Sequence, residues 1–311
     1  MSPVTTHGPQ GVLVAVAHGS AVPRAAATIA DLMTVVAERA ARRGVHIPDL
    51  RTAYLGHALP SLPQVMSMLE PGTQMTVLPL LLTAAYHSKT DIPRVLTHFP
   101  CLRITHGAPL GPHPLLLRAL ERRLAEADPG VLEDPARTGV VLAAAGSSDQ
   151  DANAAMAHLA ARWQARAGWF AVRPAYASAA FPDPAAAVTS LLRDGARRAV
   201  VATYLLAPGY FAGRIRDSSL AAGAAAVSPV LGASAEVADV LLDRFRSRAT
   251  SSSPAIAAAA RGQPDADRTN RSIPVYPFRG EAAIQLRNAN QMTDRRRRAH
   301  ARSPTIAEQV P

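Results

Sequence analysis

Short unbroken apolar runs alternate with helix-like stretches in the N-terminal part of the chain. The runs Val12 to Ala17 and Val77 to Leu82 contain no charged residue, which is typical of parallel strands covered on both faces. Between them, residues 23–43 carry apolar side chains at the helical period, namely Ile29, Leu32, Met33, Val36 and Ala40. This alternation predicts an α/β fold, in which a parallel sheet is flanked by helices.

Further elements follow from the same reading. Residues 50–56 and 102–106 are predicted strands, and residues 63–70 and 115–127 are predicted helices. A shorter helix is expected through Val95 and Leu96. Residues 128–138 contain two prolines and a glycine and are interpreted as a linker.

From residue 139 the pattern begins again. Three segments of the second part echo segments of the first at an offset near 121 to 127 residues, and a fixed offset is the signature of an internal repeat. We therefore predict two tandem copies of one α/β domain, over 11–127 and 139–249, with a flexible N-terminus at 1–10 and a disordered basic tail at 250–311. The echoing pairs are Leu13–Ser20 with Val140–Ser147, Ala53–Pro60 with Ala175–Pro182, and Pro79–His87 with Thr203–Phe211.

Three histidines stand where predicted strands of the first copy end. Ligands of open α/β sheets collect beyond the carboxyl ends of the strands, so these imidazoles are candidates for chemistry. The second copy has residues without titratable groups at the matching places. One working site per chain is predicted, in the first copy. The histidines are His18, His57 and His87, and their counterparts are Ala145, Ala179 and Phe211.

Imidazole ligands suit divalent first-row metals, and neutral imidazole also accepts protons near neutral pH. Asp91, four residues after His87, could orient that ring if both lie on one helical face, or it could simply be a charge at a helix start. The spacing alone leaves a zinc hydrolase, a metal carrier and a metal-inserting enzyme open. The chain has no His-Glu-x-x-His helix, P-loop or Gly-x-Ser-x-Gly elbow.

Charge and composition narrow the partners. The formal charge is +10 over 311 residues, and ten arginines against five acidic residues from residue 250 onward supply half of it. The remainder is mildly basic and lacks the interleaved aromatic residues that stack bases, so we expect no nucleic-acid partner in the folded part. A single cysteine, no basic leader and no membrane-length apolar run predict a cytoplasmic protein without a membrane partner.

Three motifs together resemble the sirohydrochlorin chelatase family of the CbiX/SirB type. The resemblance covers about residues 11–248 and implies two fused chelatase-like α/β domains. It also implies a monomer, in which an internal pseudo-two-fold replaces a homodimer partner. The motifs are Val-Ala-His-Gly-Ser at 16–20, Tyr-Leu-Gly-His-Ala-Leu-Pro-Ser-Leu at 54–62 and His-Ser-Lys-Thr-Asp-Ile-Pro at 87–93.

The resemblance implies insertion of a divalent metal, Fe2+ or Co2+, into sirohydrochlorin for sirohaem or cobalamin biosynthesis, with no ATP and no organic cofactor. In that family, the histidines matching His18 and His87 bind the metal and accept the pyrrole protons. Many members have glutamate where this chain has Gly56, so the neighbouring His57 is the candidate third ligand.

The substrate is a polycarboxylate, and the residues expected to contact it are Gly19, Ser20, Ala84, Ala85, Tyr86 and Lys89, with Arg24 as a further candidate. Two other functions stay open. One is a non-catalytic carrier of metal or tetrapyrrole, and the other is a nucleic-acid-associated protein that acts through its tail.

Overall fold

The computed structural model describes residues 11–84 and 87–247, except for the side chains of His87 and Ser88. The predicted N-terminus at 1–10 and tail at 250–311 lie outside the described residues. By contact, the chain divides into two compact units, 1–263 and 264–311, and all described residues belong to the first.

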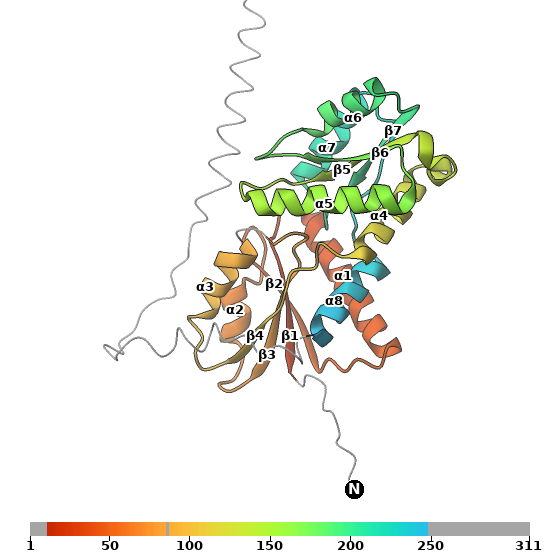
Figure 1. The fold of residues 1–311 in the computed structure, drawn as a ribbon. Coiled ribbons are helices and arrows are strands. Elements are labelled where there is room, and N and C mark those ends of the chain that lie inside the picture. Colours follow the sequence, from red (N-terminus) through yellow and green to blue (C-terminus); the bar gives the residue numbers. More distant parts are fainter. Residues whose placement is uncertain (1–10, 85–86, 248–311) are drawn as a thin grey trace, which may run out of the picture. The chain divides into compact units, whose positions relative to one another are not determined.

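The first half forms a parallel four-stranded sheet in the order β2-β1-β3-β4 (Figure 1). Strands β1 and β3 pair directly, with Val14 opposite Val77. The strands are β1 (Val12–Ala17), β2 (Asp49–Tyr54), β3 (Gln74–Pro79) and β4 (Arg103–His106). The helices are α1 (Pro23–Arg42), α2 (Leu62–Ser67), the π-helical turn η1 (His87–Asp91), α3 (Ile92–Leu96) and α4 (Pro114–Ala127).

The second half repeats this arrangement, with a parallel sheet in the order β6-β5-β7-β8. The same order confirms the predicted duplication. Its strands are β5 (Thr138–Ala144), β6 (Ala171–Tyr176), β7 (Arg198–Thr203) and β8 (Ala226–Val227), and its helices are α5 (Gln150–Ala167), α6 (Pro184–Arg193), α7 (Tyr210–Ala221) and α8 (Ala235–Ser247). The short 3-10 helices η2 (Pro129–Leu132) and η3 (Pro135–Arg137) come before it.

The repeat extends to the loops that follow the strands. Gly19 and Gly146 both have φ near +90°, and a Cβ on either would lie within 2 Å of a carbonyl oxygen in the neighbouring loop. His57 and Ala179 share a left-handed backbone, with φ of 59° and 57°. Residues 18 and 145, and residues 57 and 179, therefore occupy equivalent positions, as the sequence predicted.

The third equivalence follows from backbone pairing beyond β3 and β7. Leu80 donates to the Val16 carbonyl and Tyr204 donates to the Ala143 carbonyl, each at 2.7 Å. Since these bonds are matched, counting onward places Phe211 of α7 at the position of His87 in η1.

Strand β3 ends earlier than predicted, at Pro79 rather than Leu82. The apolar run continues past the strand because Leu80 is buried and the next two residues contact other parts of the chain. The Leu81 carbonyl accepts from the amide of Leu110 at 2.9 Å, and the Leu82 carbonyl accepts from the Tyr204 hydroxyl at 3.1 Å.

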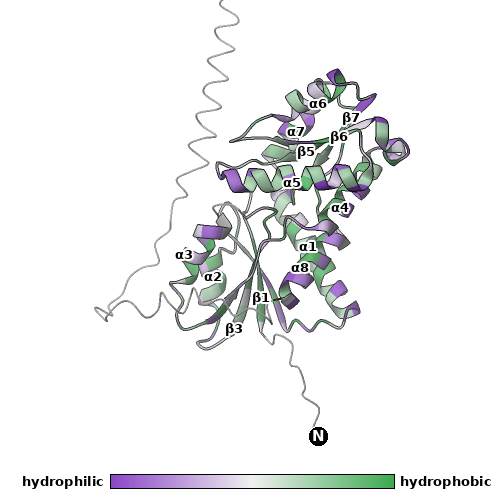
Figure 2. Cartoon of the chain, viewed as in Figure 1, coloured by the Kyte–Doolittle hydropathy of each residue, from purple (hydrophilic) through white to green (hydrophobic). Residues whose placement is uncertain are grey.

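The last helix of each half packs on the sheet of the other half. Helix α8 lies against α1 and β3, while α4 lies against β7 and β8. As a result, one hydrophobic cluster spans β1, α1, α4, β5, α5 and α8. The opposite faces have separate clusters, with α2 and α3 in the first half and α6 and α7 in the second. Figure 2 shows hydrophobic positions along the strands and on the helices that cover them.

Polar contacts hold in place α4 and α8, the two helices that pack on the sheet of the other half. Arg39 of α1 donates to both carboxylate oxygens of Asp239 on α8, with Nε to Oδ1 at 2.6 Å. Arg122 of α4 donates to Glu236 of α8 at 3.1 Å. The predicted linker contributes too, since Val131 is fully buried and Asp128 pairs with Arg198. The boundaries of the two domains, 11–127 and 139–249, remain a prediction.

Neither half is expected to fold alone. A fragment of residues 11–137 lacks α8, which buries six apolar residues. At roughly 1.5–3 kcal/mol for each large side chain, this loss approaches the whole stability of about 5–15 kcal/mol typical of a domain. Circular dichroism of the fragment should therefore show no cooperative thermal transition, and mixing with residues 138–247 should restore one. A cooperative transition in the isolated fragment would contradict a shared core.

Candidate functional site

His18 and His57 meet at the carboxyl ends of β1 and β2. Backbone pairing continues past these strands, with the amide of Gly56 donating to the His18 carbonyl at 3.0 Å. The two ring centroids are 6.4 Å apart and the rings are inclined by 22°. The structure thus brings two of the three predicted histidines together.

One nitrogen of His18 is oriented by its own loop. Its Nδ1 lies 3.1 Å from the Gly19 carbonyl oxygen. A carbonyl only accepts, so a bond there requires the proton on Nδ1, and in neutral imidazole this tautomer places the lone pair on Nε2. In this tautomer, Nε2 of His18 is the atom that can ligate a metal or accept a proton.

The unusual backbone at His57 belongs to the fold rather than to its chemistry. A positive φ outside glycine is often a mark of a functional site. Here the equivalent Ala179 has nearly the same φ and carries no functional side chain. In both halves the loop after the second strand passes close to the glycine that follows the first strand, Gly19 or Gly146. The loop must turn sharply there, and this requirement sets the conformation.

Gly19 and Ser20 lead into the N-terminus of α1. The Ser20 hydroxyl accepts from the amide of Val22 at 3.1 Å, so it stabilises the loop. Helix α1 has no side-chain cap at Val22 and no acidic residue in its first turn. Pro23 has no N–H and the amide of Ala25 donates to the Val22 carbonyl at 2.9 Å, so this N-terminus offers a carboxylate mainly the positive end of the helix dipole.

The segment that carries His87 is only partly described. Ala85, Tyr86 and the side chain of His87 lie outside the described residues, whereas Ala84 is exposed. Asp91 ends a π-helical turn and makes no capping hydrogen bond with α3. Because the side chain of His87 is not among those described, the predicted contact between His87 and Asp91 stays a prediction.

Lys89, a predicted substrate contact, bonds to the second half. Its Nζ donates to Asp149 Oδ2 at 2.8 Å. The pairing raises the pKa of Lys89 and lowers the pKa of Asp149. The loops after β1 and β7 also lie close together, since a Cβ on Gly209 would lie 3.6 Å from Ser20 Oγ. The loops after the central strands of the two halves therefore meet.

The structure also shows a strand-end histidine that the sequence reading did not select. His106 is the last residue of β4 and pairs with Val77, and its counterpart in β8 is Val227. Burial lowers the pKa of His106 below 6.5, and its Nε2 finds no hydrogen-bond partner among the described residues. The contrast between histidine and an apolar residue in the second copy, which singled out the other three, also applies here.

Metal ligation is not settled by the described part of the chain. Within residues 11–84 and 87–247, without the His87 side chain, no group of three His, Cys, Asp or Glu residues has the arrangement of a metal site. A pair such as His18 and His57 needs a further ligand, and His87 is the predicted one.

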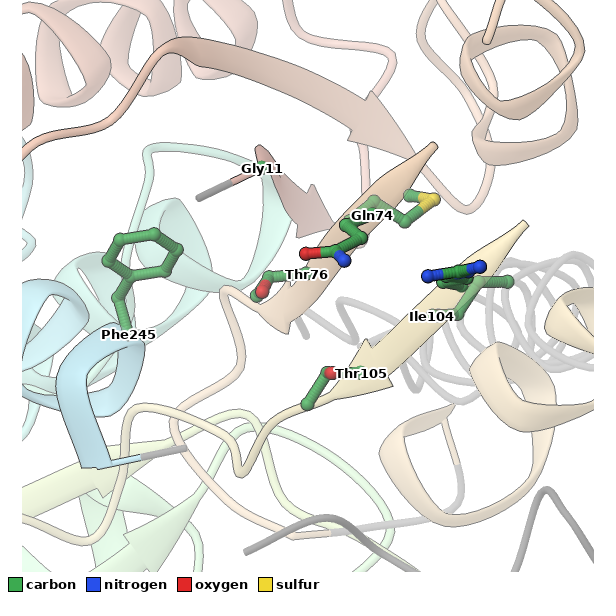
Figure 3. Close-up of a pocket in the computed structure, with 8 residues that line it drawn as sticks. Gly11, Gln74, Thr76, Ile104, Thr105 and Phe245 are labelled. Atoms are coloured by element: carbon green, nitrogen blue, oxygen red, sulfur yellow. The ribbon is translucent and has the colours of Figure 1, made fainter. Parts of the chain in front are cut away.

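A pocket of about 290 Å³ lies elsewhere in the first half. Figure 3 shows Gln74 and Thr76 of β3 beside Ile104 and Thr105 of β4, with Phe245 of α8 across from them. Gly11 and Gln74 mark the amino ends of the strands, the edge opposite to the histidines. The pocket is therefore separate from the candidate site.

Comparison with known proteins identifies the family. The CbiX family model matches residues 12–127 and 139–248. The chain belongs to the CbiX family. The two matches correspond to the two halves of the fold, so both copies are recognisable as CbiX domains.

Several named proteins are similar to this CbiX chain. A sirohydrochlorin ferrochelatase of Bacillus subtilis (strain 168) is 33% identical over 142 residues, 44% of this chain and 53% of that protein. A sirohydrochlorin cobaltochelatase of Priestia megaterium is 27% identical over 175 residues, 54% and 57%. Each alignment thus spans little more than half of the relative's length.

A solved structure agrees with the fold. The structure of SirB from Bacillus subtilis with Fe3+ has a TM-score of 0.63 and 25% identity, covering 77% of this chain and 97% of that chain.

Among the helices of the described region, none is both long and apolar enough to cross a membrane.

His106 should make stability depend on pH. Its pKa is lowered in the folded state, so below a pH of about 6.5 the unfolded chain binds more protons than the folded one. The free energy of unfolding therefore decreases as the pH is lowered. His106→Val, the residue of the second copy, should reduce this fall, by up to about 1.4 kcal/mol per pH unit. Part of the slope should remain, because burial also lowers the pKa of His113.

Urea unfolding between pH 5 and 7.5 measures this slope. His46→Val, at an exposed histidine, serves as the control and should match the wild type. If His106→Val also keeps the wild-type slope, the imidazole is protonated equally in both states.

Proposed function

We propose that this protein inserts a divalent metal, Fe2+ or Co2+, into sirohydrochlorin without ATP. The observation that carries the proposal is the difference between structurally equivalent strand ends. His18 and His57 stand where the second half has Ala145 and Ala179 on the same backbone. Similar proteins are named sirohydrochlorin ferrochelatase and cobaltochelatase, which supports this substrate and either metal.

The reaction exchanges protons for a metal ion. Two pyrrole N–H protons leave the macrocycle as a dication enters, so the charge of the ring system is unchanged. His18 and His87 would hold the partly dehydrated ion and accept the protons, because neutral imidazole does both near pH 7. His57, whose ring centroid lies 6.4 Å from that of His18, is the proposed third ligand.

The carboxylates of the substrate need positive partners. The N-terminus of α1, reached through Gly19 and Ser20, has no side-chain cap and offers the positive end of the helix dipole. The exposed Arg24 lies in its first turn. We propose Lys89 as another partner and the small residues Ala84 and Ala85, with Tyr86, as the surface beneath the ring.

Turnover distinguishes a chelatase from a carrier. Under anaerobic conditions, the absorbance of sirohydrochlorin with excess Fe2+ or Co2+ should show many turnovers by the wild type. A carrier would stop after one equivalent. His18→Ala and His87→Ala should each lose roughly 100-fold or more in kcat, the range of a removed acid–base group.

His98→Ala is the matched control, because this histidine is exposed and, among the contacts described, its ring contacts only the carbonyl of Arg94 in the preceding helix α3. It should retain the wild-type rate. Wild-type rates in His87→Ala would place the chemistry elsewhere.

His57 has a separate expected effect. As a metal ligand, it should influence metal capture more than proton transfer, so His57→Ala should raise the half-saturating metal concentration by roughly 10- to 100-fold, which is about 1.4–2.8 kcal/mol. The rate at saturating metal should change less. An unaltered metal dependence would remove His57 from the ligand set.

A further inference from the structure

Two residues of the second half hold the segment that carries His87. At one end, the Tyr204 hydroxyl donates to the Leu82 carbonyl at 3.1 Å. At the other, Asp149 accepts from Lys89 at 2.8 Å. His87 lies between these two points, five residues after Leu82 and two before Lys89.

Both contacts come from rigid positions. Tyr204 is only 1% exposed and follows β7 directly. Asp149 uses its other oxygen to cap α5, accepting from the amide of Asp151 at 3.0 Å. Its own amide donates to the Ser147 hydroxyl at 3.0 Å, and Asn153 donates to the Ser147 carbonyl at 2.7 Å. The carboxylate is therefore held in place before it meets Lys89.

Neither contact has a symmetric counterpart. Counting along the repeat, Asp149 corresponds to Val22 and Lys89 to Gly213, which cannot form an ion pair. Tyr204 corresponds to Leu80, which has no hydroxyl. The duplication therefore supports the loop of the first half in a way that it does not support the loop of the second.

The supported segment needs such help. The turn η1 has five residues and π-helical bonding, and α3 adds only five more. Helices this short are not stable by themselves, and π turns depend on their surroundings. Anchors at both ends would fix where residue 87 stands.

We propose that Asp149 and Tyr204 are positioning residues, through which the second half places η1 and His87 at the site. The catalytic part of this inference depends on the proposed function, whereas the placement of η1 does not. The second half, stripped of strand-end histidines, acts as the support for the working loop.

Amide hydrogen exchange of residues 87–96 in the full chain tests the placement. In Asp149→Asn and Tyr204→Phe these amides should exchange roughly twofold to fivefold faster, the range that one exposed ion pair contributes. Asp217→Asn, at an exposed acidic residue of α7, should leave them unchanged.

Metal insertion tests the consequence for catalysis. Asp149→Asn and Tyr204→Phe should lower kcat while the KM for sirohydrochlorin stays near the wild-type value, and Lys89→Arg should rescue the loss seen in Lys89→Met. If Lys89 acts only on substrate carboxylates, Lys89→Met raises KM and Asp149→Asn has no effect, which overturns the proposal.

The two levels of failure are distinguishable. A wild type that never inserts metal, with exchange still accelerated in the variants, would refute the proposed function and keep the placement. A wild type that turns over, with exchange and kcat unaffected by Asp149→Asn and Tyr204→Phe, would refute the positioning role.

Discussion

The hydrophobic core shared between the two sheets is the constraint on which the rest of the molecule depends. Because α8 completes the first sheet and α4 completes the second, the inner faces of both are buried in one cluster. Neither sheet can shift without exposing apolar surface that the other half covers. The strand-end loops of the two halves are therefore held against each other. This fixed arrangement allows contacts between the loops, such as that of Lys89 with Asp149.

The duplication separates what the fold requires from what the chemistry requires. Gly19 and Gly146 have the same φ and the same close approach to a carbonyl, and His57 and Ala179 share a left-handed backbone. These features persist in a half without strand-end histidines, so they are needed to close the loops. The imidazoles differ between the halves on an equivalent backbone, and this difference is the reason we propose that they serve a ligand.

Much of the fold could be predicted from the sequence because its signals are local. Apolar runs such as Val12–Ala17 reveal strands, and the echo at residue 140 reveals the repeat. The end of β3 could not be predicted, since Leu80 and Leu82 are apolar for contacts outside the sheet. The exchange of α4 and α8 was also hidden, because an amphipathic helix does not show which sheet it will cover.

The candidate site was predictable to the same extent. His18 and His57 could be found because each comes shortly after a predicted strand, and the structure brings them together. His106 escaped because β4 is a short strand with a weak pattern. The pairing of Lys89 with Asp149 joins residues 60 positions apart, and nothing in the local sequence of either indicates the other.

Fusion of two copies in one chain permits an asymmetry that a symmetric dimer cannot have. In a two-fold dimer each contact occurs twice, so an acidic residue that supports one loop also appears beside the equivalent loop. Here Asp149 stands where the first half has Val22, and Tyr204 stands where it has Leu80. The half without strand-end histidines therefore carries side chains that contact the loop of the other half and have no counterpart beside its own. Only two copies joined in one chain can differ in this way.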